Sequence, residues 1–114
     1  MSVITQISET DYSIKWLNLA KEIVLKNIDK DKYAVFLFGS MVRDPEKAYD
    51  MDIGILGKEK VPFELIEDIK DELDESIVPY RYDITDFKDS DETFRKFAFR
   101  EIEIWNKPDY IELR

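Results

Sequence analysis

The six residues from 33 to 38, Tyr-Ala-Val-Phe-Leu-Phe, are apolar on both alternations and form the longest apolar run in the chain. Successive side chains of a strand point to opposite faces of a sheet, so a strand of this composition must be covered on both faces. We therefore predict a strand in the middle of a sheet, with other elements packed on each side. The 114 residues are enough for one such domain, which we expect to span residues 1–114.

Two segments carry apolar residues at helical spacing. The first extends from residue 11 to residue 28, with Thr10 or Ser8 available as its N-terminal cap. The second extends from residue 62 to residue 75 and has a proline near its start, where proline is tolerated. Both segments are predicted to be amphipathic helices.

A last helix is predicted after Ser90, which can cap it, and Lys107-Pro108 is expected to end it. Its apolar positions, most of them expected in the core, are Phe94, Phe97, Ala98, Ile102 and Trp105. Near the chain end, Trp105, Tyr110 and Ile111 are expected to form an exposed apolar patch for a partner.

Two further segments alternate between apolar and polar residues and are predicted to be strands, from residue 50 to 55 and from residue 80 to 85. The link between residues 38 and 50 is short for a parallel crossover. The element order therefore predicts an α/β or α+β fold, with a small mixed sheet of three to four strands flanked by helices.

Acidic residues occupy the polar positions of these two strands. Asp50 and Asp52 lie on one face of their strand, roughly 6 to 7 Å apart, close enough to share divalent cations. A solvent-facing strand that tolerates acid is an equally good account of this pair. Asp83 on the later strand adds a third carboxylate and favours a metal site, unless Arg81 pairs with Asp83 as an ordinary exposed ion pair.

Gly39 and Ser40 follow the apolar strand directly, and Arg43 comes three residues later. A helix that opens after a strand offers backbone N–H groups to a phosphate, and glycine permits its close approach. Arg43 reaches such a phosphate only if a helix begins near Met41. The simpler alternative is that Gly39-Ser40 forms a tight turn and Arg43 lies on the surface.

The composition narrows the chemistry further. The chain has no cysteine and no histidine, which excludes disulfides, thiolate zinc sites and imidazole catalysis. Its 26 acidic residues favour Mg²⁺ or Mn²⁺, and its net charge of −9 argues against direct binding of nucleic acid. The first ten residues lack the features of a signal peptide and no apolar run is long enough for a membrane span, so we expect a cytoplasmic protein.

In this order, Gly39-Ser40, Asp50-x-Asp52 and Asp83 give the sequence a pattern that resembles the minimal nucleotidyltransferases of the polymerase-beta-like superfamily. The resemblance covers most of the chain and implies that family's fold. It implies two Mg²⁺ ions held by Asp50, Asp52 and Asp83, with Asp83 as a possible base. It also implies that Gly39, Ser40 and Arg43 bind the triphosphate of a nucleotide.

The sequence departs from the family pattern between these residues. The spacer from Met41 to Tyr49 is one residue shorter than usual, Met41 stands where an arginine is frequent, and Tyr49 replaces a common serine. Asp44 stands where a glycine is frequent. These changes affect the residues expected to bind phosphate more than those expected to bind metal.

The resemblance implies transfer of a nucleoside monophosphate, with ATP as the expected donor, to a hydroxyl group. Similar proteins commonly act with a small helical HEPN-domain partner, as the antitoxins of HEPN/MNT toxin–antitoxin pairs, by adenylylating the toxin or by binding it. One alternative is a binding module without turnover. Another is a transferase for a small-molecule hydroxyl, against which the absence of a second substrate domain argues.

Overall fold

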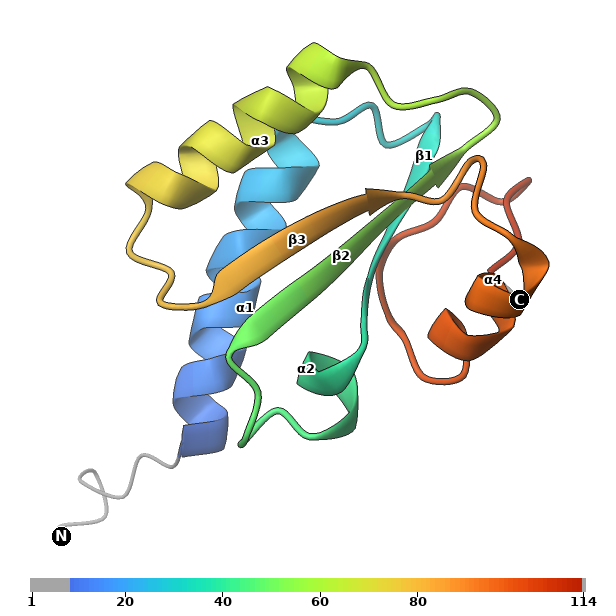
Figure 1. Ribbon diagram of the computed structural model, residues 1–114. Helices are drawn as coiled ribbons and strands as arrows, with labels where there is room; N and C mark the ends of the chain where they lie inside the picture. Colours follow the sequence, from blue (N-terminus) through green and yellow to red (C-terminus); the bar gives the residue numbers. More distant parts are fainter. Residues whose placement is uncertain (1–8, 114) are drawn as a thin grey trace, which may run out of the picture.

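Strand β1 (Tyr33–Phe38) lies inside a four-stranded sheet of order β3-β2-β1-β4, and all six of its residues are buried. The prediction of a central strand covered on both faces is therefore confirmed. The computed structural model describes residues 9–113. In chain order its other elements are α1 (Glu9–Lys26), α2 (Ser40–Arg43), β2 (Asp50–Gly57), α3 (Phe63–Glu75), β3 (Arg81–Asp86), α4 (Glu92–Ala98) and β4 (Glu103–Asn106) (Figure 1).

The sheet is mixed, as expected. Strand β1 pairs antiparallel with both β2 and β4, whereas β2 pairs parallel with β3. The short link between β1 and β2 contains only the single turn α2, which suits an antiparallel pair. The parallel pair is joined through α3, as a crossover requires.

One face of the sheet is closed by α1 and α3 (Figure 1). The residues buried beneath these helices include Ala20, Val24, Leu37, Met51, Ile53, Ile55 and Ile69. At the end of α1, Lys26 Nζ lies 2.6 Å from Glu72 Oε2, and the Asn27 amide donates to Glu72 Oε1 at 3.1 Å. These hydrogen bonds from Lys26 and Asn27 lower the pKa of Glu72 and connect α1 to α3.

The opposite face carries a second apolar cluster, formed mainly by aromatic rings and covered by α4 and the chain end. The rings of Phe36 and Phe87 meet edge to face with centroids 5.0 Å apart, and Phe99 stacks on Phe87 at 5.5 Å. Gly54 leaves room for them, since a Cβ there would come within 2.4 Å of the Phe36 ring and 2.8 Å of the Phe87 ring.

The prediction of a helix through Trp105 is wrong. Helix α4 ends at Ala98, and residues Glu103–Asn106 form β4 along the outer edge of β1. Pairing there satisfies backbone groups that β1 would otherwise leave open at a sheet edge. Two of the apolar residues that were expected in the core, Phe94 and Phe97, are 37% and 55% exposed.

The expected exposed patch at the chain end is also wrong. Trp105 and Ile111 are buried, at 7% and 6% exposure, and they belong to the clusters on opposite faces of the sheet. Tyr110 is half exposed, and its hydroxyl donates to the carbonyls of Asp31 and Lys32.

The two long helices agree with the periodicity, with differences at their ends. Helix α1 begins before Thr10, so Thr10 is not its cap, and Ser8 lies outside the described residues. Helix α3 begins directly after Pro62, as expected. Within residues 9–113, no helix combines the length and apolar character needed to cross a membrane.

Candidate active site

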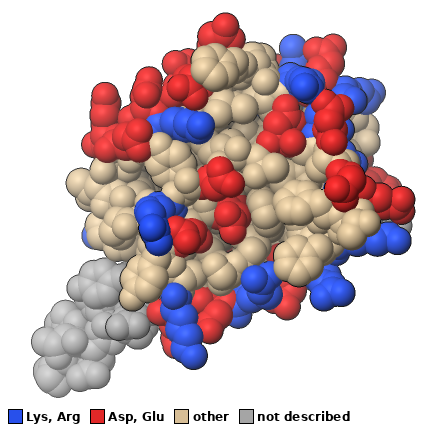
Figure 2. Space-filling model, viewed as in Figure 1, with Lys and Arg blue, Asp and Glu red and all other residues tan. Residues whose placement is uncertain are grey.

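The register of β2 and β3 brings the predicted acidic residues together. In this parallel pair Asp52 is opposite Asp83, and Asp50 is opposite Arg81. Because β2 alternates, Met51 and Ile53 point into the α1–α3 core while Asp50 and Asp52 point to the other face. Figure 2 shows acidic side chains at the middle of this face, over β2 and β3 and beside a basic side chain. The alternation predicted for both strands is confirmed.

Gly39 brings the turn after β1 against Asp52. A Cβ at position 39 would lie 2.4 Å from Asp52 Oδ2, and the φ of Gly39 is +78°, a conformation that favours glycine. After this residue, the amides of Val42 and Arg43 donate to the Gly39 carbonyl and form the single turn α2. The helical turn on which the position of Arg43 depended is therefore present.

The carboxylate of Asp52 lies in a perturbed electrostatic environment. Its pKa is raised, first by burial and then by the negative charges of Asp83 and Asp50, while Arg43 acts in the opposite direction. Burial, and repulsion by the two neighbouring carboxylates, therefore both disfavour the charged form of Asp52. A divalent cation or a nearby basic group relieves this repulsion.

Arg81 pairs with Asp50, not with Asp83. Its Nε lies 2.9 Å from Asp50 Oδ1, with side-chain exposures of 82% and 55%. The parallel register explains this choice, because Asp50 is the direct neighbour of Arg81 across the two strands. The alternative in which Arg81 pairs with Asp83 is therefore wrong. Asp83 lies beside Asp52 in the register of the two strands.

The donor set of this face suits Mg²⁺ or Mn²⁺ in type, because it consists of carboxylate oxygens. Among the residues that the structure describes, no group of three acidic side chains is arranged to hold a metal ion as it stands. Asp50 is engaged by Arg81, but this pair is exposed and contributes about 0 to 1 kcal/mol, so a cation can displace it. The types of donor therefore fit a divalent cation, and the ion pair is weak enough for a cation to compete for Asp50.

Arg43 and Met41, which flank Val42 in α2, have different surroundings. The Arg43 guanidinium is exposed and lies over the Phe97 ring of α4, 5.8 Å from its centroid. Met41 is 1% exposed and packs in the core beneath α1 and β2. A role for Phe97 at this place was not predictable from the helical spacing, which put the ring in the core.

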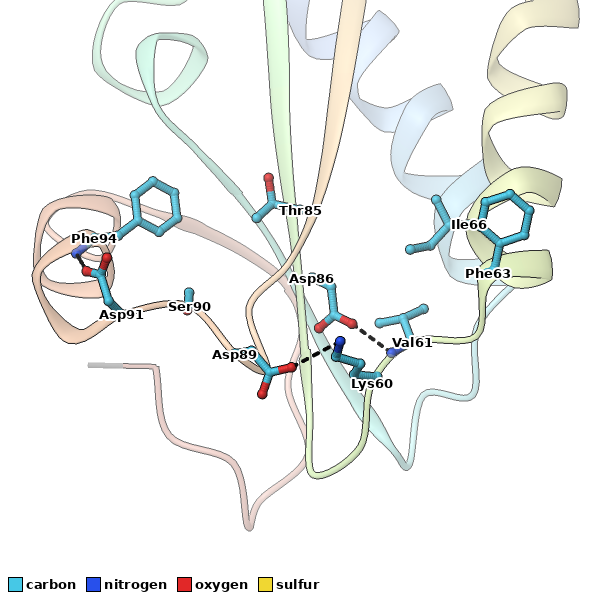
Figure 3. Close-up of a pocket in the computed structure, with 10 residues that line it drawn as sticks. All are labelled: Lys60, Val61, Phe63, Ile66, Thr85, Asp86, Asp89, Ser90, Asp91 and Phe94. Carbon is cyan, nitrogen blue, oxygen red and sulfur yellow. Dashed lines mark hydrogen bonds and ion pairs between the residues drawn. The ribbon is translucent and has the colours of Figure 1, made fainter.

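A hollow of about 620 Å³ opens at the carboxyl end of β3, next to the acidic group. It includes Thr85, two residues beyond Asp83 on the same face of β3. Phe63 of α3 and Phe94 of α4 lie on opposite sides of it (Figure 3). Its other lining residues are Lys60, Val61, Ile66, Asp86, Asp89, Ser90 and Asp91. Phe63 was expected in the apolar stripe of its helix, yet it is 71% exposed.

The sequence family described as Polymerase beta, Nucleotidyltransferase matches residues 18–109, which include the turn and the three aspartates. The chain belongs to this family. This nucleotidyltransferase is also 32% identical, over 93 residues, to the probable protein adenylyltransferase MntA of Haemophilus influenzae. That alignment covers 81% of this chain and 80% of the relative.

Solved structures share the fold of this nucleotidyltransferase. A mutant MntA–HpeT toxin–antitoxin complex gives a TM-score of 0.63 at 14% identity, over 81% of this chain and 73% of the other. A toxin–antitoxin structure with AMP-PNP gives a TM-score of 0.58 at 18% identity, again over 81% of this chain and 73% of the other. The complex of a tri-AMPylated Shewanella oneidensis HEPN toxin with MNT antitoxin gives a TM-score of 0.54 at 16% identity. This match covers 77% of this chain and 70% of the other. At such identities the likeness concerns the fold.

Proposed function

We propose that this nucleotidyltransferase transfers AMP from ATP to a hydroxyl group of a HEPN-domain protein, and that it acts as the antitoxin of that partner. The observation that carries the proposal is the position of Asp52, half-buried between the Gly39 turn and Asp83, with its pKa raised by burial and then by its acidic neighbours. The relative from Haemophilus influenzae is named a probable protein adenylyltransferase, and the three similar folds come from toxin–antitoxin structures, one of them with a HEPN toxin.

In the proposed reaction, the acceptor oxygen attacks the α-phosphorus of ATP. A new P–O bond forms to the acceptor, the bond to the β-phosphate oxygen breaks, and pyrophosphate leaves. Asp83 is exposed beside Asp52 and accepts the proton of the acceptor hydroxyl, a role for which the chain has no histidine. Gly39 and Ser40 bind the phosphates through backbone and hydroxyl groups, and Arg43 binds a phosphate oxygen.

Asp50, Asp52 and Asp83 are the residues that would hold Mg²⁺ or Mn²⁺. When bound, such cations would lower the pKa of the attacking hydroxyl and neutralise charge on the leaving phosphates. Without them, Asp52 is half-buried beside the negative charges of Asp83 and Asp50, and burial and these charges raise its pKa. For this reason we expect the affinity for nucleotide to depend on the divalent cation.

The test combines the purified chain, a HEPN-domain partner, ATP and Mg²⁺, and follows AMP addition to the partner by mass spectrometry. We expect Asp52→Asn and Asp50→Asn to reduce the transfer rate by roughly 10²- to 10³-fold. Asp68→Asn is the matched control, since it makes the same change at an exposed position of α3. Normal transfer by both site variants would overturn the catalytic proposal.

A second candidate, a binding module without turnover, is favoured by the ion pair between Arg81 and Asp50. Under that proposal the chain neutralises its partner by forming a complex, and the aspartates only contribute to its surface. Co-purification separates the two candidates. If Asp52→Asn still forms the complex and protects cells from the partner, protection is independent of transfer.

A further inference from the structure

The loop expected to bind phosphate carries few positive charges. Within α2, Met41 is buried in the core and Arg43 is the basic residue. A triphosphate carries several negative charges, and guanidinium groups bind such oxygens well because they are planar and donate two parallel hydrogen bonds. A second arginine from another element would complement Arg43.

Arg100 shares an aromatic neighbour with Arg43, although it comes from the far end of α4. Its guanidinium carbon is 6.0 Å from the centroid of the Phe97 ring, and that of Arg43 is 5.8 Å from the same centroid. The backbone explains the position of Arg100, since its amide donates to the Phe97 carbonyl and the chain turns directly after α4. One aromatic ring thus contacts two exposed arginines, one from α2 and one from the turn after α4.

Helix α4 is held firmly enough to keep this ring in place. Ala98 is buried in the aromatic cluster, and Phe94 stacks on Phe87 with centroids 5.3 Å apart. Arg95, on the same helix, donates from Nε to Ser90 Oγ at 2.8 Å and from its terminal nitrogen to the Phe87 carbonyl. Because the ring is anchored through its helix, the arginines that rest on it lose less conformational freedom when they bind a ligand.

We propose that Arg100 is a second phosphate-binding residue, which grips the triphosphate of the nucleotide together with Arg43 from the shared Phe97 ring. The inference rests on the proposed function, because it takes the Gly39 turn as the place where the triphosphate binds. Asp52 lies against that turn, and Arg43, which follows the turn in α2, acts on the charge of Asp52 and rests on the Phe97 ring. Their charge opposes that of the aspartates and attracts the phosphates.

The experiment compares Arg100→Ala with Lys96→Ala. Both variants remove one positive charge from an exposed side chain of the same region, but Lys96 pairs with Glu92, 3.7 Å away along α4. Calorimetry measures the binding of ATP, inorganic tripolyphosphate and adenosine, each with Mg²⁺. We expect Arg100→Ala to weaken ATP and tripolyphosphate binding roughly tenfold or more and to leave adenosine unchanged. Lys96→Ala should match the wild type for all three.

Two further variants test the geometry. Arg100→Lys keeps the charge without the planar fork and should recover only part of the affinity. Phe97→Leu keeps an apolar side chain without the ring and should weaken tripolyphosphate less than Arg100→Ala. Equal tripolyphosphate affinity in wild type, Arg100→Ala and Lys96→Ala would overturn the inference, and so would a wild type that binds neither ATP nor tripolyphosphate.

The transfer assay separates this inference from the proposed function. We expect Arg100→Ala to raise the KM for ATP while kcat changes little, whereas Asp52→Asn loses transfer at every ATP concentration. A wild type without transfer whose tripolyphosphate affinity depends on Arg100 would refute the proposed reaction and leave the phosphate site intact. If instead the KM of Arg100→Ala is normal and Asp52→Asn abolishes transfer, the role of Arg100 is refuted and the proposed reaction stands.

Discussion

The two faces of the sheet differ in how completely they are covered. Beneath α1 and α3, Met51 and Ile53 of β2 are fully buried among aliphatic side chains. On the other face, Asp50 and Asp52 of the same strand lie where the cover of α4 ends, one exposed and one half-buried. Strand alternation therefore separates the residues that stabilise the fold from those proposed to carry the chemistry.

The face of the sheet that carries the acidic group has two regions, of which only one is covered. Toward the end of β2, Gly54 and the aromatic rings form a packed cluster, and toward its start the acidic group meets the Gly39 turn. Glycine is required in both places by a close neighbour, a ring at Gly54 and a carboxylate at Gly39. Substitutions in the α1–α3 core and in the aromatic cluster should therefore mainly change stability. Substitutions at the acidic end should change binding and activity more.

The largest expected loss of stability comes from the closed face. Ile53→Ala should reduce the free energy of unfolding by about 2 to 5 kcal/mol, because Ile53 is 0% exposed and its truncation leaves a cavity. Urea denaturation measures this change. Ile77→Ala is the control, since Ile77 is 72% exposed and its truncation should cost no more than about 0.5 kcal/mol. Equal costs at the two positions would break the comparison.

A smaller loss is expected in the aromatic cluster of the opposite face. Gly54→Ala should reduce the free energy of unfolding by about 1 to 3 kcal/mol, because its Cβ collides with the buried rings of Phe36 and Phe87. The same denaturation experiment applies, with near-ultraviolet circular dichroism as a measure of ring packing. Wild-type stability and spectra would show that this end of the face is loosely packed.

At the acidic end, a substitution is expected to raise the free energy of unfolding instead of lowering it. The pKa of Asp52 is raised above its ordinary value of 3.8, so the folded state holds the proton more tightly than the unfolded chain does. The contribution of Asp52 to stability therefore falls as pH rises from 3.8 through the raised pKa. Without divalent cations, Asp52→Asn should be more stable than the wild type at pH 7, and this advantage should disappear toward pH 3.

Thermal unfolding across this pH range measures the effect. Added Mg²⁺ serves as the control, because it should stabilise the wild type and leave Asp52→Asn unchanged. A variant less stable than the wild type at pH 7 would mean that Asp52 supports the fold, and the separation of the two faces would then fail.

The smallest effect on stability is expected at the exposed ion pair. Arg81→Gln should change the free energy of unfolding by at most about 1 kcal/mol, because both partners are largely exposed. The same variant frees Asp50 and should tighten the binding of Mn²⁺, measured by calorimetry. Arg95→Gln contrasts with it, since Arg95 bonds to Ser90 and Phe87 and its loss should cost stability instead. Unchanged or weaker Mn²⁺ binding in Arg81→Gln would argue against the three-aspartate metal site.

Several features of the fold and the candidate site were predictable because they depend on local periodicity. The apolar run of residues 33–38 predicts a doubly covered strand, and the alternation around Asp50 and Asp83 predicts acidic strand faces. Strand β4 was not predictable in this way. Its residues match a helical stripe when taken alone, and only the open edge of β1 makes a strand the better choice.

By itself, the sequence determined the residue types and the faces of β1, β2 and β3 on which they lie. Alternation and helical spacing are properties of neighbouring residues, so the sheet, the long helices and the candidate aspartates follow from them. The tertiary structure decided which residues meet: Arg81 with Asp50, Gly39 with Asp52, and Arg43 with Phe97. These contacts join segments far apart in the chain, and strand register and helix packing set them only once the whole domain has folded.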